Sequence, residues 1–231
     1  MTLVAIHQPN YFPWLGYFHK IAVSHVFVLL DDVQFPKGSF TNRVQIGPRA
    51  GPRWLTEPAC VRLGMTIQEV GLVKGWQERH RRILHEAYRD SAHFNATWKW
   101  VDDALGAADG NCATVNGALL RAACDYLSIN TRIELASLAK VGAVGTERLI
   151  ALVRHLGGTA YLSGKGGAKY QDDAAFATAG IELRYSSFKP QPYPQWEPDG
   201  FNPGLSILDA LFHVGRDRTR WLFGAHSVVP L

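Results

Sequence analysis

The architecture of this chain is predicted from one stretch near its start, Ile6-His7-Gln8-Pro9-Asn10-Tyr11-Phe12-Pro13-Trp14-Leu15-Gly16-Tyr17-Phe18. The apolar residues 3–6 are typical of a short buried strand. Pro9 and Pro13 hold the following backbone extended and prevent the strand from continuing. From Trp14 to Val23, apolar residues recur at helical spacing. The stretch therefore predicts a strand, a rigid polar loop and a helix, and α/β folds bind ligands beside such loops.

A second apolar run, residues 25–30, predicts another strand that ends in Asp31 and Asp32. Two strands flanking one helix indicate a right-handed βαβ unit, in which the strands are parallel. The polar ends of both strands then leave the same edge of the sheet. We therefore expect the two aspartates to lie near the loop that carries His7.

The rest of the chain predicts an α/β fold. Residues 42–46 and 53–56 are typical of a hairpin, and residues 66–72 of a further short strand. Apolar spacing predicts helices at 76–89, 92–107, 114–127, 145–156 and 205–213, and strands at 132–135, 159–162 and 181–185. We predict a mixed, largely parallel sheet in a single domain of residues 1–231. A mainly helical layer at about 75–130 is inserted between its two halves.

Composition narrows the class of protein. In 231 residues, 47% are hydrophobic and 19% charged, as in ordinary soluble proteins. No apolar run approaches the ~18–20 residues that span a bilayer, and no basic leader opens the chain, so we expect a cytoplasmic protein. Cys60, Cys112 and Cys124 are too scattered for a disulfide framework or a zinc site, and no metal site is predicted.

The net charge of +4 is compatible with an anionic partner, such as a nucleotide, a phosphopantetheine arm or an acidic carrier protein. No nucleic-acid-binding module is recognisable, so nucleic acid is not an expected partner. The last residues, 216–231, contain Trp and Phe side chains that suit packing on the core or on a second subunit, which leaves a homodimer open.

His7 is the predicted catalytic base. An imidazole with an ordinary pKa near ~6.5 can take a proton from an attacking amine or hydroxyl at neutral pH. The alternative is a structural histidine that bonds loop carbonyls. Asp32, weakly preferred over Asp31, is the candidate to orient His7, as the third member of a relay does. Its alternative is a turn residue that bonds its own backbone.

Further polar residues are candidates for substrate binding. Gln8, Asn10 and Tyr11 share the loop with His7, and Asp31, Gln34, Asn42 and Arg43 follow the second strand. Arg43 is a planar donor suited to a carboxylate or phosphate, or else to a structural salt bridge. Ser163 and Gly164 open a glycine-rich turn after a strand, where backbone amides could hold a phosphate or an oxyanion. Asp209 either reaches the site or caps a neighbouring loop.

These motifs together resemble the WbqC-like protein family. The resemblance is carried by residues 7–18 with Lys20-Ile21, Asp31-Asp32-Val33-Gln34-Phe35, Asn42-Arg43 with Ile46, Trp54-Leu55-Thr56, Tyr161-Leu162-Ser163-Gly164 with Gly167 and Tyr170, Tyr193-Pro194-Gln195, and Leu205-Ser206-Ile207-Leu208-Asp209 with Leu211-Phe212 and Gly215. It adds Tyr170 and Gln195 to the predicted substrate-binding residues. It also implies a role in polysaccharide (O-antigen) or specialised-metabolite biosynthesis.

The resemblance further implies transfer of an acyl or aminoacyl group from a thioester, on coenzyme A or a carrier protein, to an amine such as an amino sugar. No tightly bound cofactor is expected, and a phosphopantetheine thioester would act as co-substrate. Two alternatives stay open. One is a nucleotide-dependent enzyme, although the chain lacks the paired histidines of known nucleotidyltransferases. The other is a non-catalytic module that binds a sugar or a carrier protein.

Overall fold

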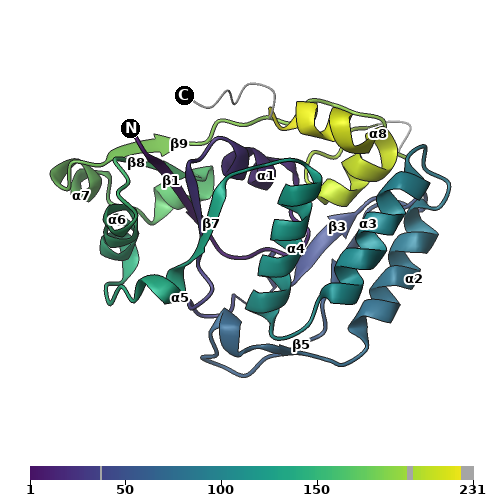
Figure 1. The fold of residues 1–231 in the computed structure, drawn as a ribbon, viewed down its shortest axis with the longest axis horizontal. Helices are drawn as coiled ribbons and strands as arrows, with labels where there is room; N and C mark the ends of the chain where they lie inside the picture. The colour runs from purple at the N-terminus through teal and green to yellow at the C-terminus, as the bar shows by residue number, and fades with distance from the viewer. Residues whose placement is uncertain (37, 197–199, 225–231) are drawn as a thin grey trace.

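The computed structural model describes residues 1–36, 38–196 and 200–224 (Figure 1). Its centre is a parallel sheet of five strands in the order β7-β2-β1-β8-β9. The strands are β1 (Leu3–His7), β2 (Val26–Leu29), β7 (Arg132–Leu135), β8 (Ala160–Ser163) and β9 (Glu182–Tyr185). The predicted α/β class is confirmed. The predicted βαβ unit is also present, because β1 and β2 pair in parallel with His7 opposite Leu29.

The two faces of the sheet bury different helices, because successive side chains of a strand point to opposite sides. Leu3 and Ala5 belong to the larger core, with α1 (Leu15–Ala22) and α4 (Cys112–Tyr126). Val4 and Ile6 belong to a second core, with α5 (Ala136–Ala139), α6 (Gly145–His155) and α7 (Asp173–Thr178). Since His7 alternates with Ile6, its side chain lies on the face covered by α1.

Helices α2 (Trp76–Tyr88), α3 (Phe94–Ala107) and α4 lie between β2 and β7 in the sequence, close to the predicted bounds. Helix α8 (Ile207–Leu222) packs against α3. Two small antiparallel sheets stand apart from the main one, β3 (Arg43–Ile46) with β4 (Arg53–Thr56) and β5 (Ala59–Cys60) with β6 (Gly71–Leu72). The main sheet is thus wholly parallel, and the antiparallel pairs that a mixed sheet would contain are separate.

Several elements differ from the prediction. The strand expected at 66–72 is a 3₁₀ turn, η1 (Ile67–Glu69), followed by the two residues of β6. The last helix is longer than predicted and continues through a break at Gly215, whose φ of 73° suits glycine. Helices α5 and α7 and the 3₁₀ turn η2 (Lys165–Lys169) were not predicted.

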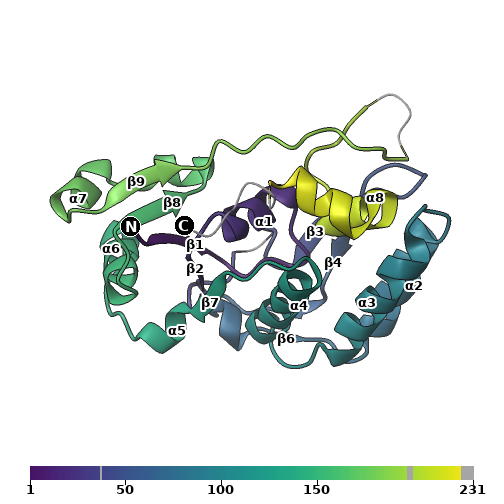
Figure 2. The ribbon, with the colours of Figure 1, turned by 45° about the horizontal axis from the view of Figure 1, so that its top comes forward.

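An extended segment follows β9 and passes over α1 (Figure 2). Phe188 in this segment stacks on His19 of α1, with ring centroids 4.6 Å apart. Among the described helices, none combines the length and apolar character that crossing a bilayer requires. Of the chain end predicted to pack on the core or on a second subunit, residues 225–231 fall outside the described part.

Candidate functional site

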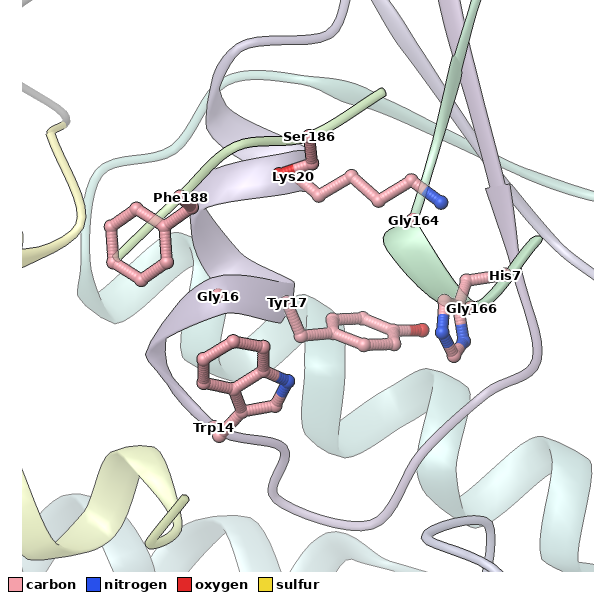
Figure 3. Close-up of a pocket in the computed structure, with 9 residues that line it drawn as sticks. All are labelled: His7, Trp14, Gly16, Tyr17, Lys20, Gly164, Gly166, Ser186 and Phe188. Atoms are coloured by element: carbon pink, nitrogen blue, oxygen red, sulfur yellow. The ribbon is translucent and has the colours of Figure 1, made fainter. Parts of the chain in front are cut away.

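A pocket of about 260 Å³ opens at the carboxyl end of β1, between α1 and the turn after β8 (Figure 3). The carboxyl ends of parallel strands are where α/β folds bind ligands. The lining combines aromatic rings, glycine backbone and two basic nitrogens, and consists of His7, Trp14, Gly16, Tyr17, Lys20, Gly164, Gly166, Ser186 and Phe188. Of the residues predicted from sequence, His7 and Gly164 are in this lining.

His7 is the last residue of β1, and its ring packs edge-on against Tyr17 with centroids 4.9 Å apart. Nδ1 lies 3.1 Å from the carbonyl oxygen of Gln8. A carbonyl can only accept, so Nδ1 carries the proton and Nε2 keeps its lone pair. Burial, then the nearby charge of Lys20, lowers the pKa of His7 to about 3. The imidazole is therefore neutral at physiological pH.

Lys20 reaches the inner end of the pocket from α1, and its side chain ends beside Gly164 and His7 (Figure 3). The residue is only 4% exposed, and Nζ donates a 2.8 Å hydrogen bond to the carbonyl oxygen of Ile6. None of the described carboxylates pairs with it within 4 Å. Burial lowers the pKa of Lys20 to about 7, so near neutrality about half of the amines are unprotonated.

The mouth of the pocket is aromatic. The ring of Trp14, just before α1, lies next to that of Phe188 in the extended segment, with centroids 6.0 Å apart and planes inclined by 59°. Gly16 allows this arrangement, because a Cβ there would lie 2.3 Å from Cη2 of Trp14. The Trp14 ring therefore lies directly on the backbone of the helix. Rings at the mouth and polar groups at the inner end suit a ligand with an apolar part and one polar end.

The glycine-rich turn forms the opposite wall. Ser163 ends β8, and its buried hydroxyl donates a 3.1 Å hydrogen bond to the carbonyl oxygen of Gly164. A Cβ on Gly167 would lie 2.3 Å from that hydroxyl, so the turn is too tight for a larger residue. Gly164 and Gly166 present bare backbone to the pocket. Ser163 therefore supports the wall and is not itself part of the lining.

The polar residues of the loop after β1 lie behind the pocket. The carbonyl oxygen of Gln8 accepts the hydroxyl of Tyr17 at 2.8 Å, which fixes the Tyr17 ring beside His7. Asn10 is buried, and the fully buried Tyr11 donates to Nδ1 of His80 at 2.7 Å. The predicted substrate-binding role of the side chains of Gln8, Asn10 and Tyr11 thus finds no support in their positions. They hold the loop that carries His7.

The expectation that an aspartate orients His7 is wrong in this structure. Asp31 is buried and accepts the backbone N–H of Ser137 at 3.0 Å and its hydroxyl at 2.6 Å. Asp32 pairs with Arg148 of α6 at 2.5 Å. Helix α5, which holds Ser137, and helix α6 both cover the face of the sheet opposite His7, so both carboxylates are bound on the side away from the imidazole. Its Nδ1 is oriented by a backbone carbonyl instead.

Three further predicted residues lie outside the pocket. Gln34 is exposed and forms a backbone bridge with Thr66. Asn42 donates a 3.1 Å hydrogen bond to the carbonyl oxygen of Glu57. Arg43 stacks over the ring of Trp54, with its guanidinium carbon 4.3 Å from the centroid, and donates to the carbonyl oxygen of Gly38. Arg43 therefore does not bind an anionic part of a ligand in the pocket.

The predicted residues from the last third of the chain also lie apart from the pocket. Tyr170 is 85% exposed. Gln195 exchanges hydrogen bonds with the backbone of Asn202. Asp209 is fully buried and accepts the hydroxyls of Tyr88 at 3.0 Å and of Tyr193 at 2.9 Å. Burial raises the pKa of Asp209 to about 7, while these bonds oppose that shift. Asp209 therefore fastens the extended segment and α2 to α8.

Sequence reasoning missed the pocket residues Lys20, Tyr17, Trp14, Ser186 and Phe188. Lys20 left a signal, because a lone lysine sits among apolar residues on a helix that is otherwise buried. Ser186 and Phe188 left none, since they follow β9, far along the chain from α1.

Among the described residues, no group of three or more His, Cys, Asp or Glu side chains is arranged to hold a metal ion. None of Cys60, Cys112 and Cys124 is among the residues that line the pocket. Cys60 is exposed on β5, and Cys112 and Cys124 are buried in α4. Burial raises the pKa of Cys124 to about 12 and that of Cys112 further still, so neither thiol ionises readily.

The chain is similar over nearly its whole length to a protein family and to a mycobacterial protein. A model of the WbqC-like protein family matches residues 8–221. The chain is 35% identical over 229 residues to "Uncharacterized protein Rv1507c" of Mycobacterium tuberculosis (strain ATCC 25618 / H37Rv), with 96% of this chain and 98% of that protein covered. No solved structure matches the chain.

Proposed function

The chain belongs to the WbqC-like protein family, and from the chemistry of its pocket we propose that it transfers an acyl or aminoacyl group from a thioester to an amine. The observation that carries this proposal is the state of His7. Its imidazole is neutral, its Nδ1 is held by a backbone carbonyl, and its Nε2 is left to accept a hydrogen bond inside the pocket. That is the arrangement an attacking amine needs.

In the proposed reaction the amine enters the inner end of the pocket and donates an N–H to Nε2 of His7. Its nitrogen lone pair attacks the thioester carbonyl, and a tetrahedral intermediate forms. The nitrogen passes its proton by way of Nε2 of His7 to the departing sulfur as the C–S bond breaks, so the products are an amide and a thiol. A thioester on coenzyme A or on a carrier protein satisfies this scheme equally.

Transfer is direct in this proposal, without an acyl-enzyme. The hydroxyl of Ser163 is buried and bonded within its own turn, and the described thiols are not in the pocket. An imidazole with a pKa of about 3 is a weak final acceptor for a proton. Its role is therefore to orient the amine and pass its proton on.

The test is product analysis by mass spectrometry, with acyl and aminoacyl thioesters of coenzyme A and of carrier proteins offered with a panel of amines. We expect an amide product whose rate falls by about 10²–10⁴-fold in His7→Ala. The matched control is His155→Ala, an exposed histidine on α6 beyond the opposite face of the sheet, which should retain full activity. Full turnover in His7→Ala would overturn the assignment of the base.

A binding module for a sugar or another flat molecule is the second candidate. The aromatic rings of Trp14 and Phe188 at the mouth of the pocket favour it, because an aromatic ring can pack against a flat ligand without any chemistry. Ligand binding that survives in His7→Ala, with no amide formed by the parent protein from any donor, would favour this candidate over transfer.

A further inference from the structure

Lys20 is a buried amine that none of the described carboxylates pairs with. Its amine is buried at the inner end of the pocket. Nζ contacts the carbonyl oxygen of Ile6 and, at 6.0 Å from the centroid, the ring of Phe27, and neither of these groups carries a negative charge. A buried ammonium without a counter-ion is costly, and an anion placed against it would remove that cost. Lys20 is part of the pocket lining, so a ligand in the pocket can reach the amine.

His7, beside Lys20, determines which hydrogen-bonding group a ligand must offer. In the tautomer fixed by the Gln8 carbonyl, Nε2 accepts a hydrogen bond and does not donate one. A carboxylate would be repelled by that lone pair, whereas an amine would be bound by it. The inner end of the pocket therefore offers one place for an amine, at His7, and one place for an anion, at Lys20.

The size and walls of the pocket complete the description. A volume of about 260 Å³ is below the ~300–1,000 Å³ typical of drug-sized ligands, so the occupant is small. Trp14 and Phe188 at the mouth favour an apolar substituent that points outward.

From these three features we infer that the pocket binds a free amino acid or a closely similar amino carboxylate, with its carboxylate on Lys20 and its amine on His7. If the proposed transfer is right, this amino acid is the acceptor of the acyl group. Its binding to the pocket does not depend on that proposal. The donor thioester then enters from the aromatic mouth, and the product is an N-acyl or N-aminoacyl amino acid.

Isothermal titration of the whole protein tests the inference without a donor. The probes are phenylalanine, phenylalanine amide and 3-phenylpropanoate, which carry both groups, the amine alone and the carboxylate alone. Glycine and leucine vary the apolar substituent. We expect the amino acid to bind about 10-fold or more tightly than its amide, because the amide lacks the charge-assisted contact with Lys20.

Proton uptake gives a second readout. Anion binding stabilises the charged form of Lys20, so at pH 8 each bound 3-phenylpropanoate, which has no amine of its own to titrate, should draw up to about one proton from the buffer. Titrations in two buffers with different heats of ionisation measure this number. The other titratable groups in the lining are His7 of β1 and Tyr17 of α1, and the buried Tyr17 phenol, whose pKa is raised, stays neutral there.

Lys20→Met should bind the amino acid and the amide within about twofold of each other and take up no proton. The matched control is Lys189→Met, an exposed lysine next to Phe188, which should behave like the parent. Circular dichroism and thermal unfolding establish that both variants fold. If none of the amino carboxylates binds, or if Lys20→Met keeps the preference for the carboxylate, the inference is wrong.

The outcomes also separate the inference from the proposed function. Amino acid binding that is tighter than amide binding, and no amide product from any thioester, would leave the inference standing and remove the transferase. Amide products formed equally well on amines without a carboxylate would do the reverse.

Discussion

The amine of Lys20 on α1 donates a 2.8 Å hydrogen bond to the carbonyl oxygen of Ile6 on β1, the residue directly before His7. The bond ties helix and strand together at the point where the strand ends. It also brings a titratable amine to the inner end of the same pocket as the imidazole. This arrangement buries an ionisable group, so its effect on the free energy of unfolding varies with pH.

Lys20→Met should therefore alter how stability depends on pH. Burial lowers the pKa of Lys20 from 10.5 to about 7 in the folded chain. Between these values the unfolded chain binds a proton that the folded chain does not. Stability of the parent consequently rises with pH by about 1.4 kcal/mol per unit in this window, and is lost as pH falls towards 7.

Urea unfolding at pH 7.5 and pH 9.5 measures this contribution. The free energy of unfolding of Lys20→Met relative to the parent should fall by roughly 2–3 kcal/mol from the lower to the higher pH. Lys189→Met, which removes an exposed lysine, should show no such change. A pH-independent difference for Lys20→Met would mean that the amine is charged in the folded chain.

Gly16→Ala should damage the pocket while sparing the fold. The new Cβ would lie 2.3 Å from Cη2 of Trp14, so the ring must leave its place against the helix. Alanine itself favours a helix over glycine by roughly 0.5–1 kcal/mol, which offsets part of the strain. We expect kcat/KM or ligand affinity to fall on the order of 10–100-fold, with a small change in thermal stability.

Gly117→Ala in α4 is the control, because its Cβ would meet only the flexible end of Arg121 at 3.2 Å and Leu29 at 3.7 Å. If Gly16→Ala retains the affinity of the parent, Trp14 is not a wall that the ligand uses.

Asp32→Asn separates a structural aspartate from a catalytic one. The carboxylate pairs with Arg148 of α6 at 2.5 Å, and both side chains are mostly buried. Weakening this pair should lower the free energy of unfolding by about 1–3 kcal/mol. Turnover of the folded variant should stay within about twofold of the parent, because the pair is not in contact with His7. A loss of 100-fold or more in kcat with unchanged stability would restore the orienting role predicted from sequence.

The central part of the fold was predictable because its signals are local. The apolar runs of β1 and β2, the prolines between β1 and α1, and the helical spacing of α2–α4 each act within a few residues. The helices α5 and α7 are only 4 and 6 residues long, too short for a periodic pattern to emerge. The long α8 was truncated in the prediction because Gly215 interrupts its pattern.

The site was predictable only in part, for a similar reason. The sequence placed His7 at a strand end and Gly164 in a turn after another strand, and parallel pairing brings those ends together. The sequence could not show that Asp32 forms an ion pair with Arg148, since this pair depends on how α6 packs against the sheet. Nor could it show that Phe188 crosses α1, because nothing in a proline-rich segment specifies its path.

Asp209 gives the last prediction, with the opposite sign to Lys20. Burial raises the pKa of Asp209 from 3.8 to about 7, so between these values the folded chain holds a proton that the unfolded chain lacks. This contribution to stability is present at low pH and is lost as pH rises towards 7, by up to roughly 4 kcal/mol in all. Nε2 of His213 lies 3.8 Å from the carboxylate, and burial lowers the pKa of His213 to about 4, an effect of opposite sign.

Asp209→Asn isolates the carboxylate from the histidine, because both the parent and the variant keep His213. Urea unfolding at pH 4.5 and pH 7.5 should show the parent losing about 2–4 kcal/mol relative to the variant as pH rises. Asp217→Asn, at an exposed position of the same helix, should leave the difference near zero. If the variant and the parent follow the same pH dependence, the Asp209 carboxylate is ionised throughout, and the hydroxyls of Tyr88 and Tyr193 are sufficient to hold its charge in the core.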